Sequence, residues 1–137
     1  MMRGTVLVAA LALVAAGCTN NNSTTPTTPS IPTTTDTKSG TVQVKGSDFQ
    51  TFTVTTTGQV DVTLTAAGPP ATIVMGLGVG QSGPGSCGLL PGASTQTAAG
   101  SSPQVSGIMT PATYCVMVYD VGNMTAPINY TVTITHP

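Results

Sequence analysis

The residues able to do chemistry in this sequence are few, and they form no recognisable catalytic set. The single histidine, His136, is the second-to-last residue, so the many serines and threonines have one imidazole at most to act as their base. Glutamate is absent, and the chain is too short to add a substrate cleft around a pair of aspartates. The sequence therefore predicts a protein that is not an enzyme.

Metal binding is the next chemistry that the residue types allow. The methionines are soft ligands for copper, but a copper site also needs histidines, and methionine more often fills gaps in a core. Oxygen ligands for Ca²⁺ come from Asn123 and from three aspartates, Asp48, Asp61 and Asp120. Turns and exposed strand positions favour aspartate without any ion. We expect no bound metal or cofactor, and we keep a calcium-dependent accessory domain as an alternative.

Cys18 ends a segment that resembles the export signal of bacterial lipoproteins. Arg3 is followed by an apolar run over residues 6–16, which is too short to cross a membrane as a helix but suits a secretory signal. Small residues then lead to the cysteine, although Ala15 stands where that family prefers leucine. The resemblance implies that residues 1–17 are removed and that Cys18 carries the lipid. An ordinary cleaved signal with an incidental cysteine is the alternative.

Residues 18–39 are expected to form the lipid-anchor cysteine and a disordered tether rich in threonine and proline. Pro26, Pro29 and Pro32 recur every third residue and favour an extended chain, and Ile31 is the only large apolar side chain. Such a segment buries too little apolar surface to offset its ordering entropy. An aspartate after the lipidated cysteine resembles an inner-membrane retention signal. Thr19 stands there instead, so we expect the outer membrane in a Gram-negative cell.

Charge is unusually scarce, at 5% of residues with a net charge of −1. A nucleic-acid partner needs a basic stripe, and the chain has only three cations, Arg3, Lys38 and Lys45. We therefore expect no nucleic-acid partner. Because charge is scarce, we also expect the solubility of the domain to depend on its hydroxyl groups.

Residues 40–137 are expected to form one all-β domain. Apolar and polar residues alternate with a period of two in several runs, at 42–45, 52–55, 60–65, 73–80, 114–119 and 128–135. Turn residues separate these runs, and valine and threonine dominate them. The pattern predicts an antiparallel two-sheet β-sandwich, jelly-roll or immunoglobulin-like, of seven or eight strands.

Three segments of this region resemble the bacterial pre-peptidase C-terminal domain. Residues 58–64 place Val60, Val62 and Leu64 after a glycine turn, and residues 111–119 read PATYCVMVY, close to that family's P-G-T-Y-x-V-x-V-Y. The final run at 130–134 matches Y-x-V-x-V, whereas Ala112 replaces the usual glycine. The resemblance implies a non-catalytic sandwich, of a kind often attached to secreted hydrolases and sometimes implicated in polymer binding.

Cys87 and Cys115 remain as an even pair in an exported chain, where disulfides persist. Alternation places Cys115 on the strand face away from the core, so a bond would fix the glycine-rich loop around Cys87 across that face. A reactive or metal-binding thiol pair is the alternative. Glycines alternate at 76, 78 and 80, which lets another segment pack close to that strand.

Met117, Tyr119 and Met124 are the candidate binding residues, as an outward apolar patch beside the disulfide. The alternative is that Leu89 and Leu90 cover this patch. The expected function is a lipid-anchored binding or assembly module of the bacterial cell envelope, with a polysaccharide or an envelope protein as partner. A purely structural surface protein is the second hypothesis.

Overall fold

The computed structural model describes residues 29–137, and within this range the chain forms strands and no helix. Accordingly, the described range offers no helical segment with the length and hydropathy to span a membrane. The eight strands are β1 (Thr34–Val42), β2 (Ser47–Val54), β3 (Gly58–Gly68), β4 (Met75–Gly83), β5 (Ser86–Thr97), β6 (Val105–Met109), β7 (Ala112–Tyr119) and β8 (Ile128–His136). The prediction of an all-β domain is confirmed.

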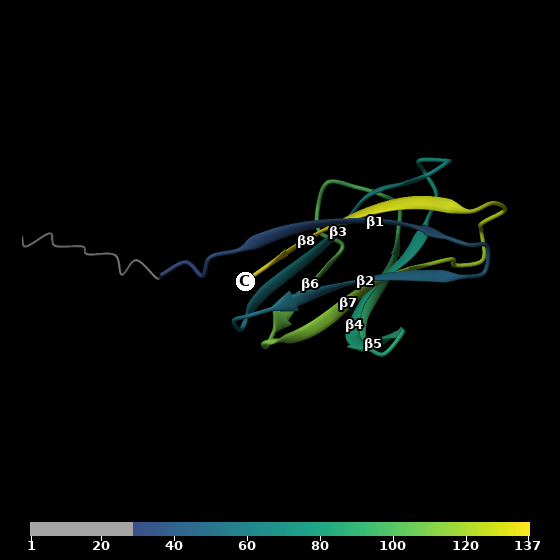
Figure 1. The fold of residues 1–137 in the computed structure, drawn as a ribbon. Helices are drawn as coiled ribbons and strands as arrows, with labels where there is room; N and C mark the ends of the chain where they lie inside the picture. The colour runs from purple at the N-terminus through teal and green to yellow at the C-terminus, as the bar shows by residue number, and fades with distance from the viewer. Residues whose placement is uncertain (1–28) are drawn as a thin grey trace, which may run out of the picture.

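The strands form two four-stranded antiparallel sheets that pack face to face (Figure 1). We call them sheet A, with the order β1-β8-β3-β6, and sheet B, with the order β2-β7-β4-β5. Every sheet neighbour is antiparallel, and successive strands mostly alternate between the two layers. This order is that of a jelly roll, so the sandwich prediction is confirmed in its jelly-roll form.

The core lies between the sheets and follows the period-two pattern. Val60, Val62 and Leu64 of β3 are fully buried, and Val116 and Val118 of β7 face them from the other sheet. Strands β3 and β8 show this most clearly, because each turns an apolar face inward and a polar, threonine-rich face outward. The largest fully buried side chains also include Met75, Leu77, Ile128 and Ile134.

The domain begins earlier than the sequence indicated. Strand β1 starts at Thr34 and pairs with β8 without interruption, from Thr34 opposite His136 to Val42 opposite Ile128. The expectation that residues 34–39 belong to the tether is therefore wrong. Threonine suits a pleated strand as well as a linker, and here it pairs across strands, with the Thr35 hydroxyl 3.1 Å from that of Thr135. The signal, Cys18 and the tether up to residue 28 lie outside the described residues.

The segment around Cys87 is also more regular than expected. It belongs to β5, which pairs with β4 in a hairpin, whereas the glycines there had suggested a loop. The register shifts between Gly78 and Gly80, and this bulge bends the hairpin over the outer face of sheet B. The bend brings Cys87 of β5 close to Cys115 of β7.

Candidate functional site

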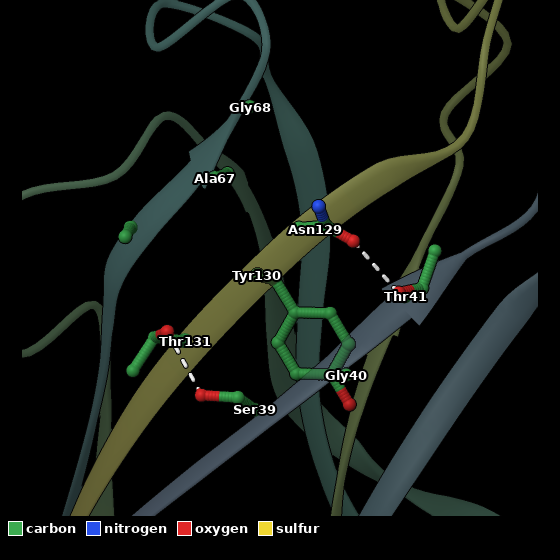
Figure 2. A pocket seen from close by; sticks show the side chains of 9 residues that line it. Ser39, Gly40, Thr41, Ala67, Gly68, Asn129, Tyr130 and Thr131 are labelled. Carbon is green, nitrogen blue, oxygen red and sulfur yellow. Dashed lines mark hydrogen bonds between the residues drawn. The ribbon is translucent and has the colours of Figure 1, made fainter.

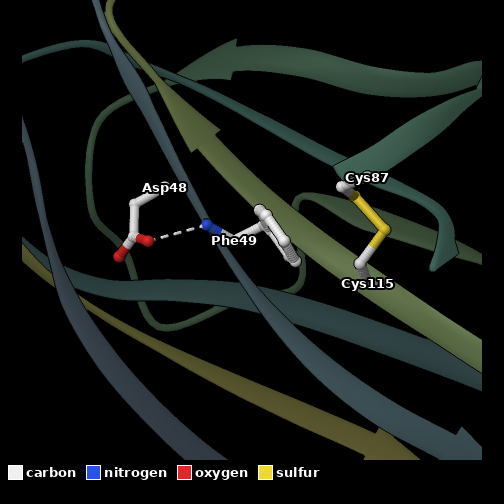
Figure 3. Close-up of a disulfide and its surroundings, with 4 residues drawn as sticks. All are labelled: Asp48, Phe49, Cys87 and Cys115. Carbon is white, nitrogen blue, oxygen red and sulfur yellow. Dashed lines mark hydrogen bonds between the residues drawn. A yellow bond between two sulfur atoms is a disulfide. The ribbon is translucent and has the colours of Figure 1, made fainter. Parts of the chain in front are cut away.

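A disulfide between Cys87 and Cys115 braces the outer face of sheet B. The two Cα atoms lie 5.8 Å apart, and 28 positions separate the residues in sequence. Cys115 lies on β7 and Cys87 on β5, which are the two neighbours of β4, so the bond spans β4. Figure 3 shows the two side chains joined through their sulfur atoms. Cys115 is fully buried, yet it lies outside the core cluster, as its outward position on the strand requires. The predicted pairing is confirmed.

The alternate glycines of β4 make this crossing possible. A Cβ on Gly80 would overlap the backbone of Gly88, so β5 can pass over β4 only where no side chain stands. A Cβ on Gly78 would meet the side chain of Leu89 at 2.8 Å. At Gly76 the ring of Tyr119 occupies the space that a side chain would need. The expectation that these glycines admit a close-packed segment is confirmed.

Four apolar side chains gather on this outer face, and we call them the sheet B patch: Phe49, Leu89, Met117 and Tyr119. Phe49 is directly paired with Met117, and Met117 with Gly78, so all three positions share one face of the sheet. Figure 3 draws Phe49 beside the disulfide, consistent with its place diagonal to Cys115. Leu89 is 37% exposed, and the other three are partly exposed.

The sequence identified only part of this patch. Met117 and Tyr119 lie where expected, but Met124 is 6% exposed and belongs to the core cluster, so its place in an outward patch is wrong. Its backbone N–H bonds the Asp120 carboxylate at 3.3 Å, and the turn directs the side chain inward. Phe49 was missed, although it stands an odd number of positions from buried Phe52 and so faces the opposite side. Leu89 is a member of the patch, and Leu90 packs against the core instead.

The patch carries no charge. Asp48 is the only charged residue in the four strands of sheet B, and it faces inward. There its carboxylate accepts a hydrogen bond of 2.8 Å from the hydroxyl of Tyr130, which belongs to sheet A. Gln50 also donates to Tyr130, at 3.4 Å, so these polar groups join the two sheets at one end of the sandwich. Burial, together with the hydrogen bond and negative charge of Asp48, raises the pKa of Tyr130 well above 10.

The aspartates considered for calcium have separate partners. The carboxylate of Asp120 accepts hydrogen bonds from backbone N–H groups, at 2.7 Å from both Lys45 and Gly122, and these bonds lower its pKa. Asp61 accepts from Ser106 and Gln59, which lower its pKa as well. Among residues 29–137, no three histidine, cysteine, aspartate or glutamate side chains come together to hold a metal ion. The local structure thus accounts for each aspartate, and no observation favours the calcium alternative.

His136 has a packing role in the sandwich. It is 7% exposed, and its ring lies 5.5 Å from that of Phe52. Its Nε2 atom has no hydrogen-bond partner among the described residues and lies 3.8 Å from a carboxylate oxygen of Asp36. The contacts shown for His136 are therefore those of a side chain packed within the sandwich.

The outer face of sheet A is covered with hydroxyl groups. The hydroxyl oxygens of Ser39 and Thr131 lie 3.0 Å apart across the two strands. The hydroxyl of Thr41 donates a hydrogen bond of 2.7 Å to the side-chain oxygen of Asn129. Beside them the sheet is hollowed into an open depression of about 590 Å³, whose β3 side is formed by Ala66–Gly68 (Figure 2). The hydroxyl groups largely satisfy one another, so this face resembles a hydrated surface more than a built pocket.

No family model matches the chain, and no curated protein matches it at a significant level. The fold and the site define the protein as an antiparallel two-sheet β-sandwich with a disulfide across one outer face.

Proposed function

We propose that this protein is a non-catalytic lipoprotein of the bacterial cell envelope, anchored in the membrane through Cys18. In this proposal residues 1–17 direct export, the following segment spaces the domain from the lipid surface, and the jelly roll acts as a binding or assembly module. The partner is an envelope polymer or protein, and the location is the outer membrane where the cell is Gram-negative.

The observation that carries the proposal is the uncharged sheet B patch beside the Cys87–Cys115 disulfide. Disulfides persist in oxidising compartments outside the cytosol, which agrees with an exported chain. A patch of partly exposed aromatic and aliphatic side chains on a braced sheet is typical of a contact surface. The enclosed position of His136 supports a role without catalysis.

The resemblance to the pre-peptidase C-terminal domain gives a finer version of this proposal. The runs that carry it lie on β3, β7 and β8, which are inner strands of their sheets. We propose that the chain is a divergent sandwich of that type, used without an attached peptidase. Support comes only from these strand patterns, whose inward apolar residues belong to the core.

Membrane fractionation with fatty-acid labelling tests the anchor. The full chain should incorporate a labelled fatty acid and sediment with membranes, whereas Cys18→Ala should do neither and should appear in the soluble fraction, because a stable anchor needs its acyl chains. The matched control is Cys87→Ala/Cys115→Ala, which removes the other cysteines and should remain labelled. Membrane association of unlabelled Cys18→Ala would refute the anchor.

A structural surface protein without a specific ligand is the second candidate. The hydroxyl pairs of sheet A favour it, because they satisfy one another across β1 and β8 and leave few groups for a ligand. A variant of the sheet B patch, Phe49→Ala, distinguishes the two candidate functions. If cells that carry the variant at normal protein levels show the same envelope defect as cells that lack the protein, the binding module is favoured. If they show no defect, the structural role is favoured.

A further inference from the structure

Tyr119 has an unusual position at the end of β7, an inner strand of sheet B. Three consecutive ring atoms, Cδ2, Cε2 and Cζ, all overlap the place where a Cβ on Gly76 would stand. An edge-on ring would bring only one of these atoms so close, so the ring lies face down on the strand. Tyr119 is partly exposed on the outer face, so the opposite side of the ring is turned towards solvent.

From this geometry we infer that Tyr119 and the rest of the sheet B patch form a binding platform for a neutral polysaccharide. The inference rests on the proposed function, since it names the partner of the same surface. A sugar ring presents an apolar face of C–H groups, and these carry partial positive charge towards the negative face of an aromatic ring. A tyrosine already held flat loses little side-chain entropy on binding, which favours a weak ligand.

The strand residues on either side of the ring match a neutral sugar. Tyr119 pairs with Ser47 of β2 on one side and with Gly76 of β4 on the other. Gly76 in turn pairs with Gln96 of β5, so these four residues form one row across sheet B. Ser47 and Gln96 are exposed, so a hydroxyl and an amide lie ready to bond sugar hydroxyl groups at both ends of the ring. No outward-facing residue of these strands carries a charge to pair with an acidic or basic polymer.

The size of the patch favours a polymer over a folded protein. Four partly exposed side chains offer about 400 Å² of contact at most, given that a large aromatic side chain has about 150–250 Å² in all. A stable protein interface buries about 800 Å² on each partner. A small contact can still hold a long repetitive chain, because many copies of a membrane-anchored protein bind it together and gain in avidity.

A sedimentation assay on the purified full chain tests the inference. The probes are insoluble cellulose and insoluble chitin, two neutral polymers with flat sugar rings, and the bound fraction is measured as the polymer concentration rises. We expect binding to at least one of them, weakened about tenfold by Tyr119→Ala through loss of the stacking surface. Gly76→Ala should weaken it similarly, because the new Cβ displaces the ring while the tyrosine itself remains.

Two controls separate stacking from general damage. Tyr119→Phe keeps the flat ring and should bind within twofold of the original chain, and Thr53→Ala changes an exposed side chain of β2 away from Tyr119 and should have no effect. Equal melting temperatures would show that the variants fold. Binding to neither polymer, or undiminished binding by Tyr119→Ala, would overturn the inference. Labelling of Cys18 would be unaffected by either result, so the envelope proposal is judged separately.

Discussion

Removing the disulfide should lower the stability of the domain by an amount that follows from its place in the chain. The perturbation is Cys87→Ala/Cys115→Ala, introduced with Cys18→Ala so that no free thiol remains. The bond closes a loop across 28 positions, which restricts the unfolded chain by about 3.5 kcal/mol on the chain-entropy model. For a domain of this size, about 3.5 kcal/mol corresponds to a fall in melting temperature of about 15 °C.

Thermal unfolding followed by circular dichroism measures the difference between this variant and Cys18→Ala alone. Reduction of the Cys18→Ala protein supplies the control, since it opens the bond but keeps both sulfur atoms in place. If loop entropy dominates, reduction and substitution should give similar falls. Because Cys115 is fully buried, a much larger fall on substitution would assign part of the effect to packing. A melting temperature unchanged by both treatments would refute the assignment of the disulfide as a brace.

Three further predictions concern other contacts. Gly80→Ala should strongly lower the free energy of unfolding in urea, because the new Cβ would overlap the backbone of Gly88. The control is Gly107→Ala, which has open space around the new Cβ and should be tolerated. Equal effects of the two substitutions would contradict the passage of β5 over β4. The raised pKa of Tyr130 means that the folded state holds its proton to higher pH than the unfolded state does. The contribution of Tyr130 to stability should therefore be constant below pH 10 and fall above it by about 1.4 kcal/mol per pH unit. Tyr130→Phe should lack this contribution, and matching alkaline curves for the two proteins would refute it. Asp120→Ala should speed amide exchange at residues 122–124 without lowering protection in the core strands, and unchanged exchange there would contradict its bonding role.

The sequence predicted the parts of the fold that depend on burial. Alternation locates β3, β7 and β8 because their inward residues are almost all large and apolar. It misses the start of β1, where Asp36 and Lys38 stand at inward positions and break the pattern. Inward-pointing charges discourage an edge strand from pairing with another chain, and the same feature hides the strand from a pattern based on hydrophobicity.

The sequence predicted only part of the candidate site, because the pattern along one strand does not show which strands lie beside it. Local alternation fixes which face of β7 carries Tyr119, but it does not reveal which strand lies beside β7. Phe49 reaches Met117 only because β2 is the neighbour of β7, and this neighbour is set by the jelly-roll topology. Met124 lies in a turn, where no period applies, and the backbone bonds of Asp120 decide its direction.

The pairing of β1 with β8 also determines how the domain carries mechanical load. A pull on the residues that precede Thr34 enters the protein at the first rung of a ladder nine residues long, next to the last strand of the chain. The resistance then comes from these backbone bonds in sheet A, whereas the Cys87–Cys115 bond joins two strands of sheet B. A pull on the N-terminal side of β1 can therefore separate this edge strand from β8 before it disturbs sheet B.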